Sequence, residues 1–419
     1  MYDLRLTPEQ LEIRDTVRDF VEHEVKPVIL NADRLQALEH PLPLELVRKA
    51  SALGLRALRL SEEAGGANAD ALTCCIVLEE LAAGDAHIAA TLGETARLGG
   101  GLFEGAMTPR QRDRYLPRFL DDDDFHLACA GRDPEADVGW GYHRPASVAA
   151  GVTLTATRQS NGDWLLEGTA RFVVNAPLAK LFVVAAAVKD EADRTIGLLV
   201  PRECAGLVIR DAQARGEAQG TPKLAWYHGV RGHLEFTHCR IPADQVLESQ
   251  PAARLHDAHS DGRGAPLTQA INLGVGRAAC EAAVAYAKLR VQGGRPIIEH
   301  QAIGSILADV AVRLHVARSI VWQAAWAADH ADAYTERSLP DMPLETIARV
   351  YTAQAVHEAV ELAAECFGAM GVMRDMPLHK YLHDARIFLQ SGSSNTTARF
   401  RVAEALAGYR RPDVSTHCA

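Results

Sequence analysis

The apolar residues of the first part of the chain recur with the spacing of amphipathic α-helices. Thr7-Pro8-Glu9-Gln10 has the pattern of a capping box with proline in the first helical turn. Further helices are expected at about Ala71–Ala83, Ile88–Phe103 and Pro109–Leu120. The pattern therefore predicts an N-terminal helical domain over residues 1–125.

Between residues 126 and 246 the spacing changes to the two-residue period of β-strands. Val152–Thr157 alternates between polar and apolar residues, and Asn161-Gly162 is a strong hairpin turn. Helical spacing returns after residue 247, for example over Ile303–Ala324. We expect a mainly α protein with a central antiparallel β-domain (126–246) and a C-terminal helical bundle (247–419).

Composition excludes several classes of function. The chain has 419 residues and a formal net charge of -10, which argues against a nucleic-acid partner. Its eight cysteines are scattered without a Cys-x-x-Cys pair, as expected for buried thiols in a reducing compartment. No apolar run approaches the ~18 residues of a membrane span, and no signal-peptide core is present, so we expect a cytoplasmic protein. His379 and His383 are spaced to share a metal, but a third ligand is missing and we predict no metal site.

Four segments carry recognisable motifs. The peptide His383–Thr396, which reads HDARIFLQSGSSNT, resembles the signature Arg-Asp-Ala-Arg-Ile-x-x-Ile-Tyr-Glu-Gly-Thr of the acyl-CoA dehydrogenase family. Gly168–Ala176 resembles the family's Gly-x-Lys-x-Trp-Ile-Thr-Asn-Ala, and Glu365–Gly371 resembles its Gln-x-x-Gly-Gly-x-Gly loop. Tyr286–Asp309 resembles its Tyr-Ala-x-x-Arg-x-x-Phe-Gly-x-Pro-Ile…Gln…Leu-Ala-Asp segment. Together these matches extend over most of the chain in the correct order.

The resemblance implies a fold and a cofactor. It implies an N-terminal helical domain, a β-barrel-like middle domain and a C-terminal four-helix bundle, with FAD between the β-domain and the bundle. The adenosine-diphosphate end of FAD would reach an adjacent subunit, so we expect a homodimer or homotetramer, or a hetero-oligomer with a related subunit. The implied substrate is an acyl-CoA or a carrier-bound acyl thioester.

Several positions match the family's flavin-binding residues. Arg290 matches an arginine that pairs with the pyrophosphate, although a plain surface arginine is the alternative. Phe172 stands where a tryptophan covers the flavin ring, with ordinary core packing as its alternative. Val174 replaces a threonine that hydrogen-bonds the ring, and Glu365 replaces a glutamine near the phosphates. The remaining matched cofactor positions are Gln301, Gly368, Gly371, Ser394 and Thr396.

The positions of the catalytic base lack a basic group. In the family a glutamate removes the substrate α-proton, and Gly392 occupies the matching position here. Some family members carry this base on a different helix, and Thr268 occupies that position. A threonine hydroxyl cannot act as a base near neutral pH. On the helix from Asp85 to Leu102, expected to line the acyl cavity, we consider His87, Glu94 and Thr95 as pocket residues.

For Glu94 a solvent-facing position is the simpler interpretation, and for His87 a helix-surface position is the alternative.

Three functions remain open. The protein is an FAD-dependent oxidoreductase that acts on an acyl thioester by non-standard chemistry, a flavin-dependent monooxygenase of the same fold, or a structural partner of a heteromeric dehydrogenase. We favour the first, which predicts failure to oxidise ordinary saturated acyl-CoAs.

Overall fold

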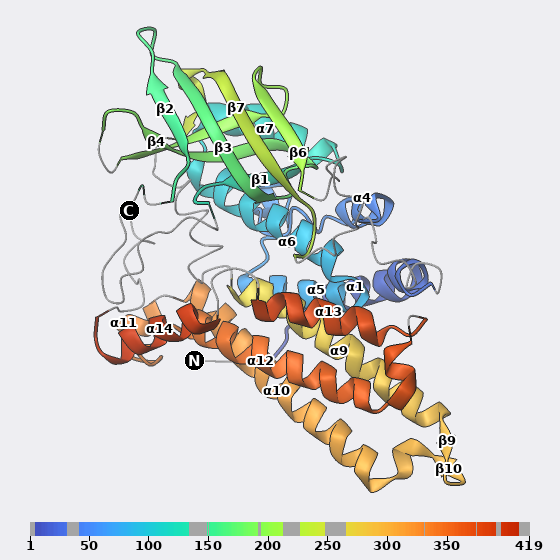
Figure 1. Ribbon diagram of the computed structural model, residues 1–419. Helices are drawn as coiled ribbons and strands as arrows, with labels where there is room; N and C mark the ends of the chain where they lie inside the picture. Colours follow the sequence, from blue (N-terminus) through green and yellow to red (C-terminus); the bar gives the residue numbers. More distant parts are fainter. Residues whose placement is uncertain are drawn as a thin grey trace, which may run out of the picture.

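The computed structural model describes residues 5–31, 42–133, 149, 151–191, 194–212, 227–247, 265–330, 332–373, 375–390 and 395–409. A β-domain lies at one end of the molecule and a bundle of long helices at the other (Figure 1). The N-terminal helices fill the space between them. This arrangement confirms the predicted fold class, mainly helical with a central β-domain.

The N-terminal helices begin at a capping box. Thr7 Oγ1 accepts from the backbone of Gln10, and the Gln10 side chain accepts from the Thr7 N–H, as predicted. The helices are α1 (Pro8–Phe20), a π-helical turn (Val21–Val25), α2 (Lys26–Ile29), α4 (Leu44–Ala52), α5 (Ala71–Gly84), α6 (Ala86–Gly101), a second π-helical turn (Leu102–Ala106) and α7 (Pro109–Asp121). Helices α5 and α6 are buried along nearly their whole length. Both therefore belong to the interior between the two ends of the molecule.

The β-domain is one eight-stranded sheet with the order β6-β7-β3-β2-β4-β5-β8, and β1 pairs with β4 beside this path. Its strands are β1 (His126–Ala130), β2 (Leu154–Arg158), β3 (Trp164–Val174), β4 (Ala179–Val188), β5 (Thr195–Pro201), β6 (Leu207–Asp211), β7 (Arg231–Ile241) and β8 (Val246–Leu247). The pairings of β4 with β1 and with β2 are parallel, and the others are antiparallel. The expectation of an antiparallel domain is therefore corrected to a mixed sheet, and the nearly continuous apolar run of β4 is the pattern of a strand buried on both faces.

The C-terminal bundle consists of α9 (Ala265–Leu289), α10 (Gln301–Asp329), α11 (Asp332–Thr335), α12 (Leu344–Glu365), α13 (Leu378–Gln390) and α14 (Asn395–Leu406). A small hairpin, β9 (Val291–Gln292) and β10 (Arg295–Pro296), joins α9 to α10 at the end far from the sheet (Figure 1). Gly274 and Gly276 on α9 sit at tight helix contacts: a Cβ at Gly274 would lie 2.4 Å from the Glu79 carbonyl oxygen on α5.

Buried ion pairs join the N-terminal helices to the bundle. Glu80 on α5 accepts two hydrogen bonds from Arg277 on α9, both of 2.6 Å, and two from Arg18 on α1. Glu79 accepts from Arg318 on α10. Both carboxylates are almost fully buried, so these bonds fix the orientation of α5 against α9 and α10.

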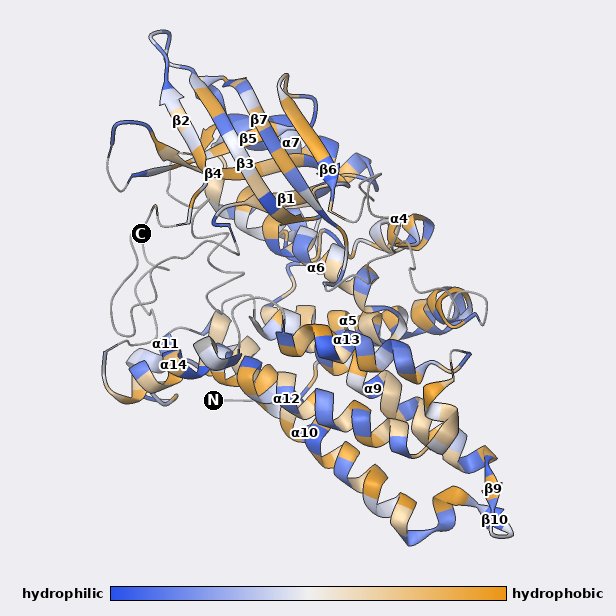
Figure 2. Cartoon of the chain, viewed as in Figure 1, coloured by the Kyte–Doolittle hydropathy of each residue, from blue (hydrophilic) through white to orange (hydrophobic). Residues whose placement is uncertain are grey.

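Apolar and polar residues alternate along the helices and strands (Figure 2). The buried apolar residues form one cluster among the helices and another within the β-domain. Within the described residues, no helix is both long enough and apolar enough to cross a membrane.

Candidate functional site

The end of strand β3 has a strained backbone. Its register against β7 shifts between Ala170 and Val173, as in a β-bulge. Phe172 has φ of 53° and Asn175 has φ of 61°, both in the left-handed region that side chains other than glycine rarely adopt. Such strain persists only where surrounding contacts hold it, and it is concentrated at functional sites.

Contacts with α6 hold this strand end. The Asn175 side-chain amide donates to the Thr91 carbonyl at 2.8 Å and to Thr95 Oγ1 at 3.3 Å. Thr95 Oγ1 also lies 3.1 Å from His126 Nδ1 on β1. Thr95 is therefore fully buried in a network between helix and sheet, which accounts for its polar group structurally. The Asn175 Oδ1 atom is buried without a donor among the described residues.

Arg231 lies opposite this strand end. It pairs with Val174 in the register of β3 and β7. One guanidinium N–H donates to the Phe172 carbonyl at 3.3 Å, and the guanidinium carbon lies 5.2 Å from the centre of the Tyr227 ring. The Nε atom is buried without an acceptor among the described residues. Burial lowers the pKa of Arg231, which is nonetheless a permanently charged side chain near neutral pH. Sequence analysis did not identify this residue.

Glu94 is buried, so the expectation of a solvent-facing glutamate is wrong. Arg97 donates from Nε at 2.9 Å and from a terminal nitrogen at 2.8 Å to the two carboxylate oxygens of Glu94. Glu94 and Arg97 are 8% and 9% exposed. Glu94 is also the carboxylate that acts electrostatically on Arg231. The helical pattern of α6 could not reveal this burial, because it does not show which elements cover each face of the helix.

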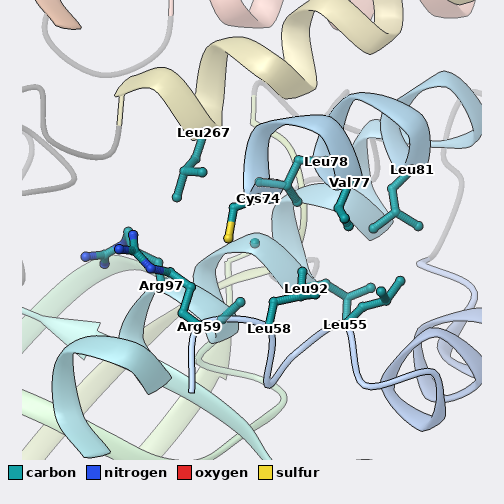
Figure 3. A pocket seen from close by; sticks show the side chains of 12 residues that line it. Leu55, Leu58, Arg59, Cys74, Val77, Leu78, Leu81, Leu92, Arg97 and Leu267 are labelled. Atoms are coloured by element: carbon teal, nitrogen blue, oxygen red, sulfur yellow. The ribbon is translucent and has the colours of Figure 1, made fainter. Parts of the chain in front are cut away.

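A small apolar cavity of about 10 Å³ lies on the neighbouring side of α6 (Figure 3). Its walls are mainly leucine and valine side chains, and the other lining residues are Arg59, Cys74, Gly93, Ala96 and Arg97. The Arg97 guanidinium lies at the edge of the cavity, away from the leucines (Figure 3). Burial raises the pKa of Cys74 to about 12, so its thiol stays protonated. Neither His87 nor Glu94 nor Thr95 contributes to these walls.

His87 belongs to a different group of residues, centred on Asp384 of α13. Lys380 Nζ donates to Asp384 Oδ2 at 2.7 Å and lies 3.4 Å from Asp85 Oδ2. His228 Nε2 and His87 Nε2 lie 3.5 Å and 3.9 Å from Asp384 Oδ1. We call Asp85, His87, His228, Lys380 and Asp384 the Asp384 cluster. His87 is half-buried within it and keeps part of its ring at the surface.

Burial and charge act against each other in the Asp384 cluster. Burial alone would raise the pKa of Asp384, but Lys380 and His228 outweigh it and hold this pKa well below its usual range. Burial would lower the pKa of Lys380, but the two carboxylates together raise it. For His228 burial dominates over the attraction of Asp384 and lowers the pKa to about 4. At neutral pH the cluster thus contains two carboxylates, one ammonium group and a neutral His228.

Of the two positions matched to the catalytic base, only Thr268 lies within the described residues. Thr268 is half-buried in the first turn of α9, next to Leu267 of the cavity wall. Gly392 lies outside the described residues, as does Ser394. Thr396 is exposed on α14. Phe172 and Val174 are half-buried at the strained end of β3. The centres of the Phe172 and His233 rings lie 4.9 Å apart.

The residues matched to the phosphate end of FAD lie elsewhere. Arg290 is exposed at the end of α9 beside the β9–β10 hairpin, and Gln301 is exposed at the start of α10. Thr268 and Arg290 are separated by the length of α9, about 33 Å at 1.5 Å per residue. Gly368 (φ 55°) and Glu365 are exposed, and a Cβ at Gly371 would lie 2.8 Å from the Ala364 carbonyl oxygen. Within one protomer, the residues matched to the flavin ring therefore lie far from those matched to the phosphate end of FAD.

Comparison with known proteins places the chain in a family. The acyl-CoA dehydrogenase N-terminal domain family matches residues 7–123, and the acyl-CoA dehydrogenase C-terminal domain family matches residues 262–407. The mitochondrial short-chain specific acyl-CoA dehydrogenase of Bos taurus is 29% identical over 410 residues, which cover 95% of this chain and 90% of the relative.

Solved structures share the fold. Butyryl-CoA dehydrogenase from Megasphaera elsdenii superposes with a TM-score of 0.79 at 24% identity, covering 97% of this chain and 100% of that one. A glutaryl-CoA dehydrogenase from Mycobacterium smegmatis in complex with FADH2 superposes with a TM-score of 0.78 at 21% identity, covering 96% and 95%. With two family matches that together span more than half of its length, the chain belongs to the acyl-CoA dehydrogenase family of oxidoreductases.

Proposed function

We propose that this protein is an FAD-dependent oxidoreductase that acts on an acyl thioester without the family's glutamate base. The observation that carries this proposal is the combination of family membership with Gly392 and Thr268 at both stations for the base. Neither residue offers a group that takes a proton near neutral pH. The fold and the cofactor are therefore expected to be those of the family, and the reaction is not.

The described residues fit a flavin ring at the strained end of β3. Asn175 Oδ1 and Arg231 Nε are buried polar atoms without partners among the described residues, and they lie where the family's ring-contacting segment falls. Buried polar atoms of this kind are usually satisfied by water or a ligand. Phe172 would cover the ring with an apolar face. Bound FAD supplies a hydride acceptor.

Two buried carboxylates of the described residues, one on α6 and one on α13, are already engaged. Both oxygens of Glu94 accept from Arg97, and Asp384 accepts from Lys380 inside its cluster. A carboxylate held by an arginine or a lysine is stabilised in its charged form and is a weak proton acceptor. Among the described residues, these two side chains are therefore poor replacements for the missing glutamate.

The spacing of the matched residues supports an oligomer. The ring-contacting residues lie at the sheet and Arg290 at the far end of the bundle, so one FAD molecule would bridge two protomers. We propose a homodimer or homotetramer with an acyl-CoA or carrier-bound acyl thioester as substrate.

Absorption spectroscopy of the purified protein tests the cofactor. Bound oxidised flavin gives bands near about 370 and 450 nm at one FAD per chain. A protein that stays colourless after incubation with excess FAD would contradict the proposal.

A second candidate function is the structural partner of a heteromeric dehydrogenase. The observation that favours it is Glu365, an exposed acid at the position matched to a phosphate-binding glutamine. A carboxylate there would repel the pyrophosphate. Co-expression with a related subunit would then give a complex with fewer than one FAD per chain, whereas the first proposal requires full occupancy of the protein purified alone.

A further inference from the structure

We propose that Arg231 donates a hydrogen bond to the flavin ring in place of the threonine that Val174 replaces. This inference rests on the proposed function, since it requires that FAD binds at the end of β3. It assigns a cofactor-binding role to a residue outside the motifs of the sequence.

The pairing of the strands places Arg231 beside the position of the lost hydroxyl. Val174 and Arg231 are direct partners across β3 and β7. Side chains of directly paired residues project from the same face of a sheet, about 4.5–5.5 Å apart at Cβ. An arginine has a long side chain with five N–H donors and therefore reaches a ligand that contacts either position.

Arg231 has donors to spare. Its described hydrogen bond goes to the Phe172 carbonyl, from one terminal nitrogen, at 3.3 Å. Its Nε is buried without an acceptor among the described residues, which is costly for a charged group. A flavin carbonyl oxygen or ring nitrogen at this place would satisfy it.

The surrounding charges leave Arg231 its positive charge. Glu94 is the carboxylate that acts on it, but Arg97 holds both oxygens of Glu94 in a bidentate pair. Arg97 therefore offsets the charge of Glu94, and Arg231 adds a further positive charge. The excess positive charge favours the reduced, more electron-rich flavin over the oxidised one.

The test compares FAD binding and the midpoint potential of bound FAD in wild-type protein and Arg231→Met, measured on the full-length chain. We expect Arg231→Met to weaken FAD binding on the order of 10- to 100-fold, the loss of one charge-assisted hydrogen bond. We also expect a lower midpoint potential. Adding Val174→Thr to Arg231→Met should restore part of the affinity, because it returns a hydroxyl donor to the paired position.

Controls separate this role from a loss of folding. Arg240→Met removes an exposed arginine near the other end of β7 and should leave FAD affinity and potential unchanged. If Arg231→Met does not fold, Arg231→Lys retains the charge without the fork, and weaker FAD binding by a folded Arg231→Lys protein supports the proposal.

Three outcomes would overturn the assignment. Wild-type affinity and potential in Arg231→Met, or in Arg231→Lys where that variant replaces it, would show that the residue does not contact the flavin. A change confined to acyl-thioester binding, with FAD unaffected, would assign Arg231 to an anionic group of the substrate instead. Failure of the wild-type protein to bind FAD would overturn the proposed function and this inference with it.

Discussion

The Asp384 cluster should contribute strongly to stability, and Asp384→Asn tests this. The substitution keeps the size of the side chain and removes its charge. Lys380, with its side chain 11% exposed, then loses its 2.7 Å partner and retains Asp85 at 3.4 Å. Breaking a buried ion pair by removing one partner costs about 3–5 kcal/mol, because the remaining charge is left buried. His228 and His87 lose the same acceptor.

Urea unfolding of the Asp384→Asn protein, followed by tryptophan fluorescence at fixed protein and FAD concentrations, measures this loss. We expect a clear drop in the midpoint concentration. Two variants serve as comparisons. Glu235→Gln breaks an exposed pair with Arg210 and should leave the midpoint unchanged. The double variant Asp384→Leu, Lys380→Met replaces the pair by apolar side chains but leaves Asp85 buried without its lysine, so it should recover only part of the loss. Equal midpoints for Asp384→Asn and Glu235→Gln would refute the reasoning.

Three further predictions concern pH and glycine positions. Burial lowers the pKa of His228 and of His126 to about 4 from 6.5, so the unfolded chain binds these protons first and stability falls as pH drops from about 6.5 to 4. At 1.36 kcal/mol per pH unit, the free energy of unfolding falls by ~3 kcal/mol for each histidine. His228→Gln should therefore flatten the dependence of the urea midpoint on pH, and an unchanged slope would contradict this. Gly371→Ala should destabilise the protein by on the order of 1–3 kcal/mol, because the new methyl group would lie 2.8 Å from the Ala364 carbonyl oxygen; wild-type thermal stability would argue against that contact. Gly304→Ala on α10 meets no atom within 4 Å and should stabilise the helix by up to ~1 kcal/mol, so a lower melting temperature would show that this position is not an open helix surface.

Local patterns predicted the elements of the fold well. The capping box at Thr7, the turn at Asn161-Gly162 and the spacing along α10 are signals that depend on neighbours within a few residues. The parallel pairings of β4 depend on how distant segments meet, although its nearly continuous apolar run is typical of a strand buried on both faces.

The site was less predictable, for a related physical reason. His87, His228 and Asp384 come from α6, the segment before β7, and α13, and no local pattern signals that they converge. Glu94 looked like a surface residue because a single helix pattern does not show what covers each face. Arg231 gave no sequence signal at all, since its importance depends on its pairing with Val174. The roles of Gly392 and Thr268 remain predictions from the resemblance to the family.

Anaerobic addition of butyryl-CoA to the FAD-loaded protein tests the central claim most directly. Because Gly392 and Thr268 provide no group to remove the α-proton, the flavin band near about 450 nm should stay unchanged. Rapid bleaching of that band by butyryl-CoA would show that ordinary dehydrogenation occurs and would contradict the account.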